Sequence, residues 1–475
     1  MNADAWHAAV QGLSEGRWTL SGLWGDEKTV HMTLLEGPEL RVLSLACPGG
    51  NFPSVGLLHP PAIRLERTIS DLFGLTPRGA PDQRPWLDHG NWGLRYPLAA
   101  PESGAAQEVY PFLSAEGEGI SQIAVGPVHA GIIEPGHFRF HANGETVVRL
   151  EARLGYTHKG TETLMRGTSL DEAGKLAGRV SGDSTVAYAI AFARAAEAAL
   201  DIEAPPRAHW LRALMAELER LANHLGDIGA ICNDASFALM LAHCGILREL
   251  VLRASNICFG HRLMRDCIIA GGTARDLDTA KTLVLRSLVF EIRSRFPKLV
   301  TLYDETASLQ DRTVAAGILK PELALKFGAG GYVGRASGRD FDVRRDVVYP
   351  PYGQLSFEIP VMQEGDVNAR VWIRIREVEQ SLSLIEQILG ALPGGPIRNE
   401  NMSGAGEGLA LVEGFRGDIL VWLRLDADGR VARCHLRDPS WFQWPLLEAA
   451  IEGNIVADFP LCNKSFNCSY SGCDL

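Results

Sequence analysis

The chain has 475 residues, of which 46% are hydrophobic and 22% are charged, and it carries a net charge of −11 at pH 7. This composition predicts a globular protein with more than one domain, and the negative charge argues against nucleic acid or an anionic lipid surface as a partner. Nine scattered cysteines and the lack of a signal peptide predict a reducing cytoplasm. No apolar run reaches the ~18–20 residues that cross a bilayer. A membrane role therefore has to come through partner subunits.

Residues 1–100 predict a small α/β domain. The apolar runs 30–35 and 40–45 flank the turn signal Glu-Gly-Pro-Glu and predict a β-hairpin. Residues 62–75 place apolar side chains on one helical face, and Gly74 predicts the end of that helix. Residues 101–121 are rich in Ala, Gly, Ser, Glu and Pro and predict a linker.

Residues 122–475 predict a second, mainly helical domain. Strands are predicted at 123–125 and 145–150, with Asn143-Gly144 as a hairpin turn. Helical patterns dominate 172–298 and include a long amphipathic helix that begins at Pro205-Pro206. A further helix is predicted over 371–391, and short strands at 419–424 and 430–436. The fold class is therefore α+β, a helical bundle with β-hairpins at its edges.

Two glycine-rich stretches, 327–334 and 404–408, look superficially like dinucleotide-binding loops. Neither places a third glycine in phase after a strand, so both are interpreted as turns. NAD is expected to bind elsewhere in a wider complex, and no cofactor is expected to bind this chain directly.

Several short motifs occur in a fixed order along the chain. Those of the first domain are 64–67, 71–75 and 86–97, and those of the second are 126–129, 134–139, 155–162, 217–224, 260–263 and 364–370. On the first set, the chain resembles the small peripheral-arm subunit of respiratory complex I. On the second set, it resembles the quinone-site subunit of complex I and, more strongly, the large subunit of group 4 membrane-bound nickel-iron hydrogenases. The resemblance implies that two subunits are fused in this chain.

The resemblance also implies a metal site that this sequence has lost. The family binds nickel through two Cys-x-x-Cys pairs, one of them in the C-terminal tail. In the register of Ala457-Asp458, that pair would stand at Ser469 and Gly472, whereas Cys468 and Cys473 lie one residue outside these positions.

The other cysteine pair would fall near residues 179–184, where serines stand instead. No cysteine occurs between Cys47 and Cys232. The tail cysteines supply only three thiolates at loose spacing, so we interpret them as incidental, and no metal ligands are predicted. The quinone-binding tyrosine of complex I would fall at about Ser181, and its second quinone-loop histidine has no counterpart in Ile132-Ile133-Glu134.

Eight residues are predicted to act at the site. The resemblance places His129, Glu134 and His137 on a loop that lines the central cavity of the relatives, where a histidine beside a carboxylate relays protons; the alternative for His137 is a structural role in the hairpin. Asp234 matches a carboxylate on a proton path, and its alternative is a solvated helix end. The remaining predicted residues are Ser181 and Asp183 in the emptied metal site, with Lys159 and His158 near a partner's iron–sulfur cluster.

Two functions follow from the resemblance. The first is a subunit that passes electrons from a partner's iron–sulfur cluster to a quinone-like or unknown acceptor. The second is a non-redox scaffold that transmits conformational change. A genuine nickel-iron hydrogenase subunit is the least favoured alternative. The expected partners are an iron–sulfur small subunit and antiporter-like membrane subunits, with no nucleic acid. The expected location is cytoplasmic, peripheral on the inner face of the cell membrane.

Overall fold

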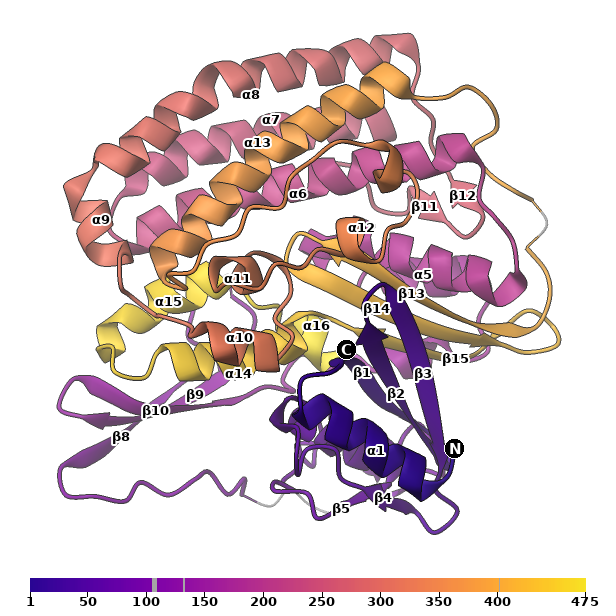
Figure 1. Ribbon diagram of the computed structural model, residues 1–475, viewed down its shortest axis with the longest axis vertical. Helices are drawn as coiled ribbons and strands as arrows, with labels where there is room; N and C mark the ends of the chain where they lie inside the picture. The colour runs from indigo at the N-terminus through magenta and orange to yellow at the C-terminus, as the bar shows by residue number, and fades with distance from the viewer. Residues whose placement is uncertain (105–108, 131–132, 401) are drawn as a thin grey trace.

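The structure is a computed structural model that describes residues 1–104, 109–130, 133–400 and 402–475 (Figure 1). Its N-terminal part is a three-stranded antiparallel meander flanked by two helices. The elements are α1 (Ala3–Ser14), β1 (Thr19–Asp26), β2 (Thr29–Glu36), β3 (Glu39–Ala46), β4 (Asn51–Pro53), η1 (Pro60–Ala62), α2 (Ile63–Phe73) and β5 (Thr76–Arg78). The predicted hairpin is confirmed, because β2 pairs with β3. The predicted helix is α2, which ends at Gly74 in the left-handed conformation that glycine adopts readily.

A second small sheet follows. Its antiparallel strands are β8 (Ile120–Val125), β9 (His137–Asn143) and β10 (Thr146–Arg153), preceded by the short pair β6 (Leu94–Arg95) and β7 (Glu102–Ser103). The predicted turn at Asn143-Gly144 joins β9 to β10 and is confirmed. Part of the predicted linker, 105–108, lies outside the described residues.

Four long helices form the bundle at the top of Figure 1: α6 (Pro206–Asp234), α7 (Ala238–Phe259), α8 (Thr279–Glu305) and α13 (Val367–Ala391). Helix α6 packs against α7 and α13, and α8 packs against the same two helices. The leucines of α6 at three- and four-residue steps, such as Leu214, Leu218 and Leu221, are fully buried. The fold class is confirmed as mixed α+β.

A central antiparallel sheet contains both strands predicted at 419–424 and 430–436, but the prediction that they lie at the edge of the fold is wrong. Its strands are β13 (Gly406–Gly414), β14 (Gly417–Leu425) and β15 (Val431–Arg437). Helix α5 (Thr185–Leu200) covers one face, and Trp24 of β1 packs on Trp422 at the other. The sheet therefore lies inside the protein rather than at its edge.

The predicted turn at 404–408 is likewise wrong, because β13 begins at Gly406. A Cβ on Gly408 would lie 2.0 Å from the carbonyl oxygen of Ala195 in α5. These glycines thus allow a helix to approach a strand closely. The other predicted turn, 327–334, runs into a short helix, α11 (Gly331–Ala336).

The remaining elements are short connectors. They are α3 (Thr161–Met165), α4 (Leu170–Ala177), η2 (Gly182–Ser184), β11 (Ile268–Ile269), β12 (Gly272–Thr273), α9 (Ala307–Thr313), α10 (Pro321–Lys326), α12 (Val343–Asp346), η3 (Tyr352–Gln354), α14 (Ser440–Ala450), η4 (Val456–Asp458), α15 (Phe459–Phe466) and α16 (Ser471–Asp474).

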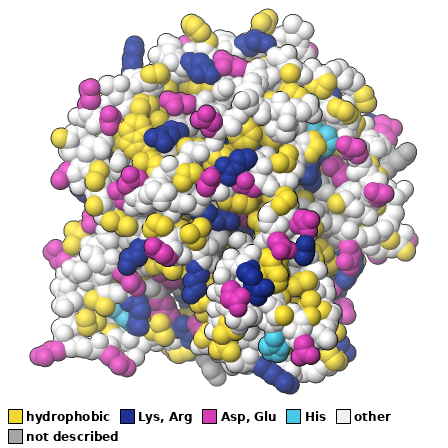
Figure 2. Space-filling view, in the orientation of Figure 1, with side chains coloured by type: hydrophobic (Ala, Val, Ile, Leu, Met, Phe, Trp, Pro, Cys, Tyr) yellow, Lys and Arg dark blue, Asp and Glu magenta, His cyan; other side chains and the backbone are white. Residues whose placement is uncertain are grey.

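Two hydrophobic cores hold these elements together. One lies in the helical bundle and under the central sheet. The other is shared: Trp6 and Phe52 of the N-terminal part belong to the same cluster as Trp444 and Phe466 near the C-terminus. The two predicted domains therefore pack through a joint core, and their boundary stays a prediction. Within the described residues, no helix combines the length and apolarity needed to span a membrane. Figure 2 shows acidic and basic side chains interspersed over the visible face.

Candidate functional site

The C-terminal tail, residues 459–475, lies in the middle of the structure (Figure 1), and most of its residues are buried. The carbonyl oxygen of Leu475 accepts hydrogen bonds from the backbone N–H groups of Lys159 (2.7 Å) and Gly160 (3.1 Å). The carboxylate of Asp474 accepts hydrogen bonds from the backbone N–H groups of Gly155 (2.8 Å) and Thr157 (2.9 Å) and from the Thr157 hydroxyl (2.7 Å). These bonds fix the tail against the loop that follows β10.

The two segments where the resemblance places the cysteine pairs, residues 179–184 and the C-terminal tail, are in contact. The hydroxyl oxygens of Ser181 and Ser469 lie 3.0 Å apart, and the Ser181 hydroxyl donates to Asp183 Oδ1 (2.8 Å). Arg416 donates to the same carboxylate from both terminal nitrogens, from Nη1 to Oδ1 at 2.7 Å and from Nη2 to Oδ2 at 2.5 Å. The result is a closed cluster of serines around an ion pair, which we call the serine cluster (Ser181, Asp183, Arg416 and Ser469).

The charge of Arg416 controls the ionisation of Asp183. Desolvation alone would raise the pKa of Asp183, but the guanidinium of Arg416 and the hydrogen bonds from Arg416 and Ser181 outweigh it, so the pKa lies below its ordinary value. Asp183 is therefore a carboxylate at neutral pH. The cavity that touches Asp183 measures about 10 Å³, which is room for about one water molecule.

The tail position Gly472 has no room for a cysteine. A Cβ on Gly472 would lie 2.5 Å from Asp438 Oδ2 and 2.9 Å from Ser469 Oγ. Asp438 is itself held in place, because it accepts hydrogen bonds from the Tyr188 hydroxyl (2.8 Å) and the Ser440 N–H (2.9 Å). A nickel centre therefore does not fit this arrangement, since hydroxyls and a carboxylate replace the soft thiolates it requires.

Metal ligands do not gather elsewhere in the described part of the chain. There, no group of three or more His, Cys, Asp and Glu side chains could hold a metal ion. The tail cysteines Cys462, Cys468 and Cys473 are all buried, and burial raises the pKa of each thiol, in Cys462 to about 11. They remain protonated at neutral pH.

Glu134 and His129 border the tail on its more exposed side. The backbone N–H of Ser471 donates to Glu134 Oε2 (3.1 Å), and the Tyr470 hydroxyl lies 3.4 Å from His129 Nε2. Both Glu134 and Lys159 are solvent-exposed. Residues 131–132 lie outside the described residues, so the structure describes only Ile133 and Glu134 of the segment Ile132-Ile133-Glu134.

Lys159 and His158 link this exposed side to the serine cluster. Lys159 Nζ donates to the carbonyl oxygen of Val180, which is adjacent to Ser181 (2.9 Å). Desolvation lowers the pKa of Lys159, against the opposing charges of Glu134 and Asp474. His158 Nδ1 donates to the carbonyl oxygen of Asp474 (2.6 Å), and desolvation lowers its pKa.

Two predicted residues lie outside this group. His137 lies on β9, where its Nδ1 donates to the carbonyl oxygen of Gly126 (3.4 Å) and Arg139 Nε lies 3.4 Å from its Nε2. Asp234 is the last residue of α6, and burial raises its pKa while the charge of Lys464 lowers it. Within the described ranges, neither residue hydrogen-bonds to the serine cluster or to Glu134. Their catalytic roles stay predictions.

Arg416 and Asp438 were missed by the sequence analysis. Arg416 lies with Phe415 in the two-residue turn between β13 and β14, and both side chains are buried. A hairpin turn usually lies at the surface, so the sequence analysis did not predict that Arg416 is buried at the site. The available signal was a pair of apolar-rich strands joined by Gly-Phe-Arg-Gly, in which the bulky apolar Phe415 takes one of the two turn positions.

A hydrogen-bonded chain runs from the serine cluster into the helical bundle. Arg416 Nε donates to the carbonyl oxygen of Asn467 (2.5 Å), and Asn467 Nδ2 donates to Asp227 Oδ1 (3.0 Å). Asp227 Oδ2 in turn accepts from Arg374 Nε of α13 (3.1 Å). These bonds connect the tail to α6 and α13.

Comparison with known proteins agrees with this architecture. The family described as "Respiratory-chain NADH dehydrogenase, 49 Kd subunit" matches residues 234–405 and 399–475. Formate hydrogenlyase subunit 5 of Escherichia coli is 33% identical over 89% of this chain and 77% of its own length. An NADH-quinone oxidoreductase subunit of Syntrophobacter fumaroxidans is 32% identical over 73% of this chain and 94% of its own length.

A solved structure shares the fold. A chain of the membrane-bound sulfane sulfur reductase, described as an archaeal respiratory membrane complex, superposes with a TM-score of 0.71 at 27% identity and covers 75% of this chain and 99% of its own. These likenesses extend over most of the sequence and include both complex I and hydrogenase subunits. The chain belongs to the family of the 49 kDa subunit of respiratory-chain NADH dehydrogenase and the large subunits of membrane-bound hydrogenases, a family of oxidoreductase-complex subunits.

Proposed function

We propose that this chain is the peripheral subunit of a membrane-associated respiratory complex that works without nickel. In this proposal it passes electrons from an iron–sulfur cluster in a partner subunit to a quinone-like acceptor, and antiporter-like membrane partners move ions. The observation that best supports this proposal is the serine cluster. In it, the Asp183–Arg416 ion pair, Ser181 and Ser469 stand where the family's thiolates would be.

The exposed side of the tail supports the redox role. Glu134, Lys159 and His129 surround residues 470–475, and all three are accessible to some degree. A histidine and a carboxylate beside an acceptor can supply protons when the acceptor is reduced. Lys159, a cation on this face, would raise the reduction potential of a cluster docked against it.

A second function has its own support. The cavity beside Asp183 has room for about one water molecule, and the polar groups of the serine cluster bind one another. The hydrogen-bonded chain through Asn467 and Asp227 reaches α13. A scaffold that transmits movements of the tail to the bundle would use these features without any chemistry at the cluster.

Electron transfer in the assembled complex separates the two functions. The native complex is purified with wild-type chain, with Glu134→Gln, with Asp234→Asn, and with Glu145→Gln as an exposed control, and quinone reduction and ion movement are measured. The redox function predicts slower turnover in Glu134→Gln and Asp234→Asn with intact assembly. Wild-type turnover in both variants, or a complex that reduces no quinone, would defeat the redox function and favour the scaffold.

A further inference from the structure

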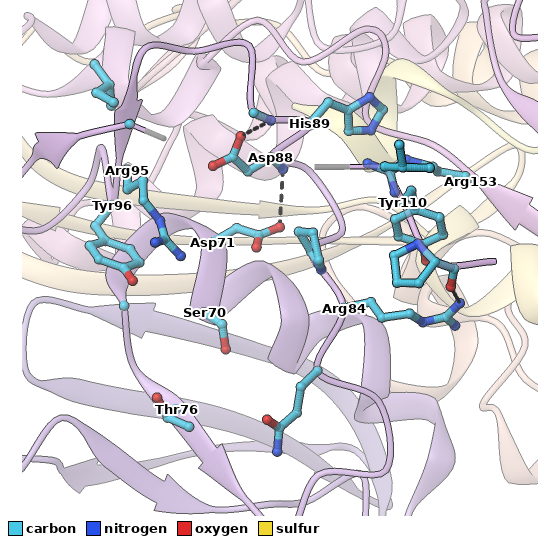
Figure 3. Close-up of a pocket in the computed structure, with 18 of the residues that line it drawn as sticks. Ser70, Asp71, Thr76, Arg84, Asp88, His89, Arg95, Tyr96, Tyr110 and Arg153 are labelled. Atoms are coloured by element: carbon cyan, nitrogen blue, oxygen red, sulfur yellow. Dashed lines mark hydrogen bonds between the residues drawn. The ribbon is translucent and has the colours of Figure 1, made fainter. Parts of the chain in front are cut away.

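A large cavity lies between the N-terminal part and the strand β10, away from the tail. Its volume is about 660 Å³, which is within the usual range for small-molecule sites. Figure 3 shows Arg84, Tyr110 and Arg153 on one side of this cavity and Arg95 and Tyr96 on the other. None of the eight residues predicted from the sequence lines it.

Arg153 is the unusual member of this lining. The residue is only 5% exposed, and its Nη1 has no hydrogen-bond partner among the residues that the structure describes. It forms no ion pair with any of them; instead its guanidinium lies over the Tyr110 ring, 3.5 Å from the ring centre. Buried arginines are ordinarily paired, because an uncompensated charge in the interior is costly.

The other charges around the cavity are already engaged. Arg84 pairs with Asp82 (2.7 Å) and Glu151 (2.6 Å), and Arg67 pairs with Asp82 (3.1 Å). The carboxylate of Asp71 accepts the backbone N–H groups of residues 86–88. Arg67 and Arg84 thus occupy Asp82 and Glu151, and Arg153 is the buried arginine of this lining that has no ion-pair partner among the described residues.

In the described part of the chain, no lining carboxylate forms an ion pair with Arg153, although the charge of Asp71 attracts it. His89 Nε2 donates to the carbonyl oxygen of Leu154 (2.8 Å), and desolvation lowers the pKa of His89 to about 4, so it is neutral. Asp88 Oδ1 accepts from the backbone N–H of Gly90 (2.7 Å). Exposed Arg95 lies across the cavity and, among the described residues, has no ion-pair partner.

We propose that this cavity is a binding site for a ligand that carries an oxyanion group, with Arg153 as its anchor. A phosphate or carboxylate would accept hydrogen bonds from the guanidinium, including the Nη1 that has no acceptor, and would neutralise the buried charge. The Tyr110 ring lies against the guanidinium and holds it in place beside the cavity. The site is independent of the proposed redox function.

The test measures binding of inorganic phosphate to the full-length chain by calorimetry at constant ionic strength, with acetate as the carboxylate probe. One molecule of phosphate or acetate should bind per chain, and Arg153→Gln should weaken binding about ten- to a hundredfold. Arg153→Lys keeps the positive charge but loses the planar guanidinium, so it should bind with intermediate affinity. This variant still tests the proposal if Arg153→Gln does not fold. Arg41→Gln, an exposed arginine far from the cavity, removes the same charge and should bind like wild type.

A second arm distinguishes the source of the oxyanion. Vesicles of phosphatidylglycerol that capture wild type but not Arg153→Gln, without binding of free phosphate or acetate, would identify a lipid headgroup as the ligand. In a further variant, Glu108, which lies outside the described residues, is replaced by glutamine. Binding that appears only in Glu108→Gln would mean that the chain supplies its own anion, and would overturn the proposal. So would equal binding in Arg153→Gln and wild type, or no saturable binding of any probe.

Discussion

Asp183 and Arg416 stand 233 positions apart in the chain and form a two-point ion pair, with Nη–Oδ distances of 2.7 and 2.5 Å. Arg416 is almost fully buried, whereas the Asp183 side chain is 34% exposed. The pair joins the turn between β13 and β14 to η2, the segment just before α5 that carries Asp183.

Removal of Arg416 should therefore destabilise the chain. Arg416→Gln leaves Asp183 as a carboxylate without its cation, and we expect the free energy of unfolding to fall by about 2–4 kcal/mol, less than for a fully buried pair because Asp183 is partly solvated. Denaturant unfolding of the full chain measures this. Arg345→Gln, which breaks solvent-accessible pairs with Asp340 and Asp346, should cost only about 0–1 kcal/mol. Equal losses in the two variants would contradict the importance of the Asp183 pair.

A side chain at position 472 should not be tolerated. Gly472→Ala places its Cβ against Asp438 and should destabilise the fold by about 1–3 kcal/mol through overpacking. Gly390→Ala is the matched control, because its Cβ would meet nothing within 4 Å and alanine favours the helix α13. Thermal unfolding compares the two variants. A Gly472→Ala variant as stable as wild type would show that Asp438 moves aside easily.

Glu219 should make stability fall as the pH rises. It accepts the backbone N–H groups of Val186 (2.7 Å) and Ala187 (3.0 Å) at the start of α5, and desolvation raises its pKa to about 8. The folded chain thus holds this proton more tightly than the unfolded chain, where a glutamate has a pKa of ~4.3. The stabilisation is present in full below the unfolded-state pKa of ~4.3 and is lost as the pH rises through the folded-state pKa of about 8.

The measurement is the free energy of unfolding between pH 5 and pH 9. Each such proton contributes a slope of up to about 1.4 kcal/mol per pH unit. Glu219→Gln cannot titrate, so its stability should decline less steeply with pH than that of wild type. Glu203→Gln, at an exposed position, should keep the wild-type slope. Identical slopes in wild type and Glu219→Gln would show that Glu219 is ionised throughout this range.

Nickel should be absent from the native complex. Ser181, Ser469 and Gly472 provide no thiolate, and the tail cysteines are buried and protonated. We expect elemental analysis to find no stoichiometric nickel and gas assays to find no hydrogen uptake. Nickel that survives chelation in a one-to-one ratio with the chain would refute the proposed loss of the metal site.

The sequence by itself determined the family motifs, the long helices and the loss of cysteine between Cys47 and Cys232. Helix α6 was predictable because its buried leucines repeat at three- and four-residue steps, a local property of the chain. Strand β13 was not, because a strand buried on both faces shows no alternation and its glycines resemble those of a turn.

Only the tertiary structure decided the chemistry of the site. The sequence alone assigned Ser181 and Ser469 to the expected ligand positions. Their contact, and the contact of Arg416 with Asp183, depend on how a buried hairpin packs against α5 and the tail. The same holds for the contact of Asp438 with Gly472. It also holds for Arg153, which has no ion-pair partner among the described residues around it. Such contacts join segments that are far apart in sequence, so local patterns carry no record of them.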